Sequence, residues 1–188
     1  DLGVTSPALL KRFGNRQALL VAALRPSLSP AWIDKVDAGP TRGPLASQLA
    51  DMFAHIAAHM HEAVPCVMAL RESGLPHEQC FPDPAVHERG LLAVRQWLDR
   101  ARRAGLVVAT ELDAVAYAIV GALQTRAFFS HLMQRKTTKR EQRAYAEQLG
   151  RFFARGLALP DEAMTVRVPS VAKPAGSRKR ARAPREES

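Results

Sequence analysis

The sequence is poor in cysteine and in aromatic residues: its 188 residues include two cysteines and 6% Phe, Trp and Tyr. Cys66 and Cys80 are too few for a disulfide framework and form no CxxC pair. They are interpreted as inert thiols, with redox sensing as the alternative. No apolar run approaches the roughly 18 residues that a membrane span needs, and no secretory signal opens the chain. These absences predict a cytoplasmic protein without a membrane partner.

Signatures of catalysis are also missing. The chain has no glycine-rich phosphate loop, no nucleophile elbow and no convincing carboxylate pair, so we predict no enzyme activity and no cofactor. His55 and His59 have the i, i+4 spacing of a helical metal site. The run His-Ile-Ala-Ala-His lacks the glutamate of a zinc protease, and no second helix offers an obvious ligand pair. A metal sensor is therefore the less favoured interpretation, and we predict no metal site.

Acidic residues are scarce relative to basic ones. The chain has 27 Lys and Arg against 18 Asp and Glu, a formal net charge of +9. Such an excess favours polyanionic partners, nucleic acid first and a membrane surface second. Nearly half of it lies in residues 170–188, where six basic residues accompany two glutamates. We expect residues 161–188 to form a basic disordered tail, which either binds nucleic acid without sequence preference or solubilises the protein.

No stretch shows the period-two alternation of a β-strand, whereas helical periodicity runs through most of the chain. We therefore predict an all-α fold. Pro65 should kink or split the longest helix, and Asp83 should cap the helix that follows the loop at 74–84. The predicted helices are Ser6–Phe13, Arg16–Leu24, a short one at Trp32–Val36, Leu45–Ser73, Pro84–Ala104, Asp113–Gln134 and Lys139–Leu157.

Broad apolar stripes on the last two predicted helices suggest a bundle that a second subunit completes. The candidate dimer residues are Val115, Ile119, Leu123, Leu149, Phe152 and Phe153.

Methionine and other apolar residues line the predicted helix Leu45–Ser73, which suggests an adaptable apolar ligand pocket between helices. Each of these residues is also compatible with an ordinary core. The candidate pocket residues are Met52, Phe53, His55, Ile56, His59, Met60, Trp97, Gln124 and Phe128. Among them His55, His59 and Gln124 are the polar groups expected to orient a ligand.

The run GVTSPALLKRFGNRQALL, Gly3–Leu20, describes two short helices separated by a tight break. Thr5 is expected to cap the first helix through its hydroxyl, Gly14 to end it, and Asn15 to cap the second. This spacing suits a helix-turn-helix, in which the second helix of the motif enters the major groove of DNA. Here that helix would be Ser6–Phe13, whose small residues Ser6, Pro7 and Ala8 allow a close approach. The alternative is an ordinary helical corner with solvated basic residues.

The same run resembles the recognition segment of TetR-type (tetracycline-repressor-like) transcriptional regulators, and the resemblance covers about the first 24 residues. It implies an all-helical homodimer whose last two long helices form a four-helix bundle across the dimer. It also implies a partial helix-turn-helix DNA-binding domain at 1–24 and a ligand-binding and dimerisation domain at 25–160. The family usually has Tyr where this chain has Leu10. Its first helix and most of its second would precede Asp1, so we expect the natural N-terminus to lie further upstream.

Carried onto this sequence, the resemblance implies that small residues approach the bases and basic residues contact phosphates. Leu10 would meet a thymine methyl group. The candidate DNA-binding residues are Thr5, Ser6, Pro7, Ala8, Leu10, Lys11, Arg12 and Arg16. The sequence thus predicts a ligand-responsive repressor that a small apolar or amphipathic molecule releases from a double-stranded DNA operator. The alternative is a helical small-molecule-binding or scaffold protein without sequence-specific DNA binding.

Overall fold

The computed structural model describes residues 5–76, 78 and 85–158, and these residues form helices joined by turns and loops, with no β-strand among them. The predicted all-α fold is therefore confirmed. The predicted cap Asp83, the residue Cys80 and the predicted tail at 161–188 lie outside the described residues. In chain order the helices are α1 (Ser6–Phe13), α2 (Arg16–Leu28), α3 (Trp32–Asp37), α4 (Leu45–Glu72), α6 (Ala85–Arg103), α7 (Leu112–Leu132) and α8 (Lys139–Leu157).

The helices α1 and α8 begin and end where the sequence predicts, whereas two helices differ from prediction at a proline. α2 continues through Pro26 to Leu28, and α4 continues through Pro65 to Glu72, so of the predicted kink or split at Pro65 the split does not occur. A proline inside a helix removes one backbone hydrogen bond. The segments beyond the two prolines carry Leu28 and Leu70, which belong to one apolar cluster, and this burial offsets the loss.

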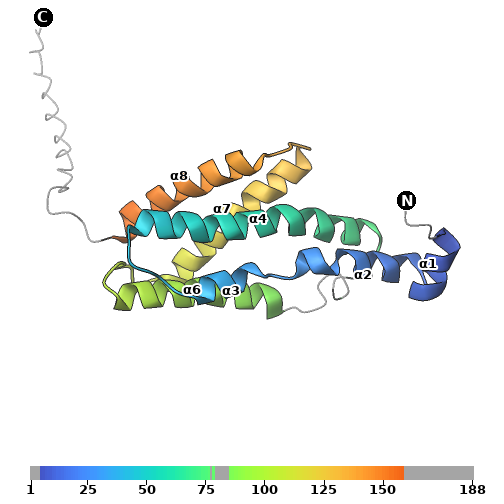
Figure 1. The fold of residues 1–188 in the computed structure, drawn as a ribbon, viewed down its shortest axis with the longest axis horizontal. Coiled ribbons are helices and arrows are strands. Elements are labelled where there is room, and N and C mark those ends of the chain that lie inside the picture. The colour runs from blue at the N-terminus through green and yellow to red at the C-terminus, as the bar shows by residue number, and fades with distance from the viewer. Residues whose placement is uncertain (1–4, 77, 79–84, 159–188) are drawn as a thin grey trace, which may run out of the picture.

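The longest helix, α4, runs along the body of the molecule, with α8 on one side and α3 and α6 on the other (Figure 1). α7 crosses α4 and also packs against α6. Apolar side chains from all five helices meet in one core. Its largest fully buried members are Phe53, Leu49, Ile56, Leu98, Ile119, Leu123, Val36, Val94 and Val107.

A glycine allows α8 to approach α4 closely. A Cβ atom at Gly150 would lie 2.8 Å from the carbonyl oxygen of Ala46 and 2.9 Å from the amide nitrogen of Ala50. Only a residue without a side chain fits between these two backbones. Nearby, the rings of Phe53 and Phe153 meet edge to face with their centroids 5.7 Å apart. The two helices are thus locked together by close backbone contact and by aromatic packing.

Hydrogen bonds set where α8 begins and how it aligns with α4. The Thr138 hydroxyl accepts a hydrogen bond from the Glu141 N–H at 3.2 Å, and the Glu141 carboxylate accepts one from the Thr138 N–H at 2.7 Å. This reciprocal arrangement is a capping box. One turn further along, the Arg143 guanidinium donates to Asp51 of α4 at 2.7 Å.

A second and smaller apolar cluster joins α2 to the end of α4. Its buried members are Leu70 and Leu75, and the α2 residues packed against them are Leu20, Val21, Leu24 and Leu28. No residue of α2 is fully buried. This cluster therefore attaches α1 and α2 to the rest of the described chain through a thin layer of leucines and one valine.

Gly150→Ala is expected to lower the free energy of unfolding by about 1–3 kcal/mol, because the added methyl group forces two helix backbones apart. Gly156→Ala is the matched control in the same helix, since nothing lies within 4 Å of the place its Cβ would take. That change should be neutral or stabilise the protein by up to about 1 kcal/mol. Urea unfolding followed by circular dichroism measures both variants, and equal stabilities would contradict the close contact.

Candidate nucleic-acid interface

The helix α1 lies at one end of the molecule and packs against α2 (Figure 1). Leu9 and Phe13, four residues apart, are half-buried, whereas the other described side chains of α1 are exposed. Most of the surface of this helix is therefore free to meet a partner.

Backbone conformation ends α1 abruptly. Gly14 has a φ of +85°, a value that favours glycine, and its N–H donates to the Leu10 carbonyl oxygen at 2.8 Å. At the other end, Thr5 has extended backbone but its hydroxyl makes no capping hydrogen bond. The predicted side-chain cap at Thr5 is therefore wrong. The Thr5 carbonyl oxygen instead accepts the first helical bond, from the Leu9 N–H at 3.2 Å.

Asn15 starts the next helix, as predicted. Its side-chain oxygen accepts a hydrogen bond from the Ala18 N–H at 2.8 Å, which satisfies one of the free amide groups at the start of α2. Gly14 and Asn15 together complete the turn between α1 and α2 without any longer loop. The short connection fixes the angle at which α2 supports α1.

The exposed surface of α1 and of the start of α2 carries positive charge. No Asp or Glu occurs between Thr5 and Ile33, and within the described residues Lys11, Arg12 and Arg16 form no ion pair. The Arg12 guanidinium lies 5.7 Å from the centroid of the Phe13 ring. The charge is therefore available to an external anion.

The structure keeps most of the candidate DNA-binding residues together on this surface. Leu10 is 41% exposed; the side chain of Ser6 lies outside what the structure describes. The remaining candidates, all exposed, are Thr5, Pro7, Ala8, Lys11, Arg12 and Arg16.

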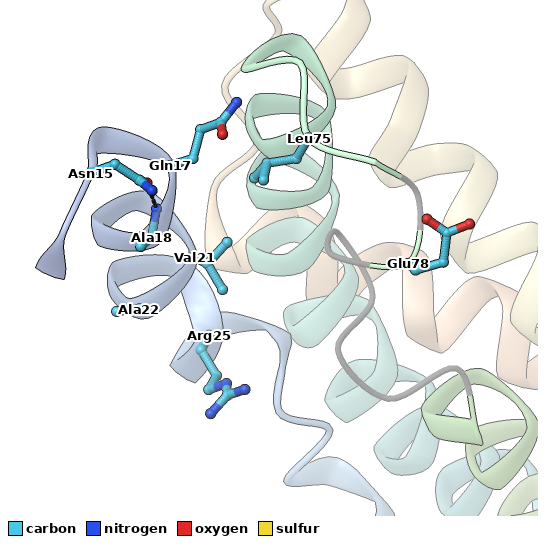
Figure 2. Close-up of a pocket in the computed structure, with 8 residues that line it drawn as sticks. All are labelled: Asn15, Gln17, Ala18, Val21, Ala22, Arg25, Leu75 and Glu78. Carbon is cyan, nitrogen blue, oxygen red and sulfur yellow. Dashed lines mark hydrogen bonds between the residues drawn. The ribbon is translucent and has the colours of Figure 1, made fainter.

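An open groove of about 630 Å³ lies where α2 meets the end of α4 (Figure 2). Val21 and Leu75 form its apolar part, and Arg25 and Glu78 are its charged members. Beside it, the Gln17 side-chain amide donates to the Ser73 carbonyl oxygen at 3.2 Å. The start of α2 is thus held to α4 by one hydrogen bond next to a groove, rather than by continuous packing.

The candidate pocket residues differ in burial. Four of them are buried in the main core, namely Met52, Phe53, Ile56 and Trp97. His55, Gln124 and Phe128 are exposed, and His59 and Met60 are half-buried. The predicted polar set of His55, His59 and Gln124 is therefore divided between exposed and half-buried positions on α4 and α7.

His59 lies against a buried indole. The rings of His59 and Trp32 have centroids 6.5 Å apart, and the Trp32 Nε1 is buried without a hydrogen-bond partner among the described residues. Burial lowers the pKa of His59, an effect that the charge of Glu62 partly opposes. An unpaired buried donor beside a neutral imidazole is a place where a ligand acceptor would be stabilised.

Metal binding finds no support in the part of the chain that the structure describes. It contains no group of three or more His, Cys, Asp or Glu side chains placed to hold an ion, and Cys66 is a free, half-buried thiol. Nor does any described helix combine the length and apolar character needed to cross a membrane.

The candidate dimer residues differ in burial, and two of them must be removed from the proposed interface. Ile119 and Leu123 are 0% and 1% exposed in the core of the single chain. They have no surface left for a second subunit, and their assignment to an interface is wrong. Val115, Leu149 and Phe153 pack against the same core and are half-buried. Phe152, at 70% exposed, is the candidate whose side chain remains largely accessible.

Other large apolar side chains of the last two helices are accessible. Tyr117, Phe129 and Leu132 of α7 and Phe152 of α8 are each more than half exposed, and we call these residues the exposed apolar set. The sequence analysis missed its α7 members. The available signal was that α7 is apolar around most of its circumference, which is typical of a helix with neighbours on several sides.

No family model matches the chain, and no curated protein is significantly similar to it. The functional assignment therefore depends on the residues themselves and on the resemblance of the opening run.

Acid is expected to destabilise the fold through two half-buried histidines. Burial and then the charge of Arg126 lower the pKa of His61, as burial does for His59. The stability that these neutral imidazoles contribute is present above their unfolded pKa of about 6.5 and is lost as the pH falls through the lower folded values.

Between about pH 7.5 and 5, the Tm of the wild-type protein should therefore fall further than that of a His59→Gln/His61→Gln variant. His55→Gln, an exposed change on the same helix, should keep the wild-type pH dependence. Differential scanning fluorimetry across this range measures all three proteins. An identical pH dependence in the double variant would contradict the prediction.

Proposed function

We propose that the protein is a cytoplasmic, DNA-binding transcription regulator, a repressor that a small molecule releases from its operator. The observation that carries the proposal is α1, a cationic helix of eight residues exposed at one end of the molecule and supported by α2. Such a helix fits a major groove about 12 Å wide. The resemblance of Gly3–Leu20 to TetR-type regulators supports the same assignment.

Each exposed group of α1 has a role in this proposal. Pro7 and Ala8 are small and let the helix backbone approach the base edges, while Leu10 meets a thymine methyl group. Lys11, Arg12 and Arg16 bind phosphates on either side of the groove. Because no carboxylate competes for these cations within the described residues, binding DNA requires no internal ion pair to break.

A second copy of the chain completes the proposed regulator. Two DNA half-sites one helical turn apart need two identical reading helices, one from each subunit, related by two-fold symmetry. We assign the exposed apolar set to this contact, since large apolar side chains are costly to leave in water.

The effector is proposed to be apolar or amphipathic and to bind beside α4, where Trp32 offers an unpaired donor next to His59. The end of α4 meets α2 through the leucine cluster and the Gln17–Ser73 hydrogen bond. A ligand that prefers one position of α4 would therefore bias the orientation of α1. Only unequal affinity for the DNA-bound and released states produces such a shift.

Selection from a random duplex library, followed by mobility-shift titration, tests DNA recognition. The full chain should enrich a palindromic site. Arg12→Ala/Arg16→Ala should strongly weaken the shifted complex and reduce the slope of log K against log salt by roughly two per subunit, through the loss of two phosphate contacts.

Arg155→Ala is the matched control for this experiment, because Arg155 is exposed in the last turn of α8, far from α1 (Figure 1). It should bind like the wild-type protein. Retention of full affinity by the double variant would exclude α1 as the reading helix. Binding that is lost on deletion of residues 170–188 and shows no sequence preference would instead indicate a tail-driven contact.

For the dimer, Phe129→Glu or Phe152→Glu should convert the protein to a folded monomer, because either change puts a charge into the proposed apolar contact. Ile119→Asp should instead unfold it, since Ile119 is fully buried in the single chain. Light scattering after size exclusion, with circular dichroism, separates these outcomes. Ala104→Glu is the exposed control. A dimer that survives both Phe changes would rule out the exposed apolar set as the contact between subunits.

A further inference from the structure

The guanidinium of Arg126 lies in a polar cluster where α7, α8 and α4 meet. It stacks on the ring of Tyr145, with its central carbon 4.0 Å from the ring centroid. Its Nε is buried and has no hydrogen-bond partner among the described residues. The ring covers one face of the guanidinium, but its donors lie at the edge, and a ring stacked on the face cannot accept from them.

Neutral polar groups lie around His61, which is near this cation. The Thr137 hydroxyl lies 3.5 Å from His61 Nδ1, and the Gln142 side-chain amide donates to the Thr137 carbonyl oxygen at 3.4 Å. Arg126 is close enough to His61 to lower the pKa of that imidazole. His61 is thus a neutral hydrogen-bonding neighbour and supplies no compensating negative charge.

A carboxylate that feels the charge of Arg126 is already engaged. Glu141 feels the charge of Arg126, but its carboxylate is held by the N–H and hydroxyl of Thr138 at 2.7 and 3.0 Å. No ion pair joins it to Arg126. Arg135 also acts on Glu141.

We propose that Arg126, with Thr137 and His61 beside it, binds the carboxylate of a small organic acid. A guanidinium recognises a carboxylate through parallel N–H donors. A monoanion matches one half-buried cation among neutral groups, whereas a dianionic phosphate would remain partly uncompensated. The aromatic ring of Tyr145 gives the organic part of such a ligand an apolar neighbour.

The assignment of this anion as the effector rests on the proposed function, whereas the binding site does not. Under the proposed function, an amphipathic acid held by α7 and α8 at this site would be the effector, in place of a ligand at Trp32 and His59, and its binding would bias α4 through His61.

Isothermal titration of the full chain with sodium hexanoate tests the site directly, at concentrations up to about 20 mM so that weak binding near 1 mM is detected. Hexanoate should bind saturably at one site per chain. Hexanamide, which has the same shape without the charge, and chloride or phosphate at equal ionic strength should bind at least about tenfold more weakly.

Arg126→Gln should weaken hexanoate binding by about tenfold to a hundredfold through loss of the charged hydrogen bonds. Arg126→Lys keeps the charge but lacks the planar fork and should lie between Gln and wild type. Arg151→Gln, an exposed change on α8, should bind normally. Circular dichroism confirms that each variant is folded. Should Arg126→Gln not fold, Arg126→Lys gives the decisive comparison.

The proposal is overturned if the wild-type protein binds no hexanoate, if hexanamide or chloride binds equally well, or if both Arg126 variants bind like the wild type. A mobility-shift titration with the selected DNA then separates the two claims. Hexanoate that binds at Arg126 without weakening the DNA complex supports the site and removes only its role as effector site.

Discussion

The contact between α4 and α8 at Gly150 is the constraint on which the rest of the described structure depends. Because the two backbones nearly touch there, a helix of 28 residues is clamped along its first half. Phe53, Ile56 and Leu49 then face the main core, where α6 and α7 cover them. The free end of α4 projects from this core and provides Leu70 and Ser73 as the support for α2. The position of α1 follows from that support.

The two apolar clusters differ greatly in size, and this difference has a mechanical consequence. The main core joins five helices, whereas the cluster that holds α2 contains two buried leucines and a few half-buried side chains. Elements with little buried apolar area open and reorient at low free-energy cost. The unit of α1 and α2, attached in this way, is suited to small changes of orientation, and the groove that Gln17 lines leaves room for them. The hydrogen bond between Gln17 and Ser73 favours one orientation of α2 relative to the end of α4.

Local signals in the sequence were reliable where one short segment decides the outcome. Gly14 and Asn15 could be predicted as the break between α1 and α2, since a positive φ and a side-chain cap depend on neighbouring residues. Thr5 shows the limit of this reasoning, because its position at the helix start was predicted but its hydroxyl bond does not form. The prolines Pro26 and Pro65 show it too. Local propensity favours an end or a split, and the leucines beyond them belong to a long-range cluster that keeps both helices intact.

The sequence by itself determined the helical class, the order and approximate length of the helices, and the cationic character of the first helix. These properties follow from periodicity, capping residues and charge, which are local. Only the tertiary structure decided that Ile119 and Leu123 lie in the core while Tyr117 and Phe129 face outward, and that Arg126 meets Tyr145 rather than a carboxylate. Periodicity defines the faces of a helix but does not state which face a distant segment covers. That choice depends on packing between residues far apart in the chain, where volume and backbone distance decide.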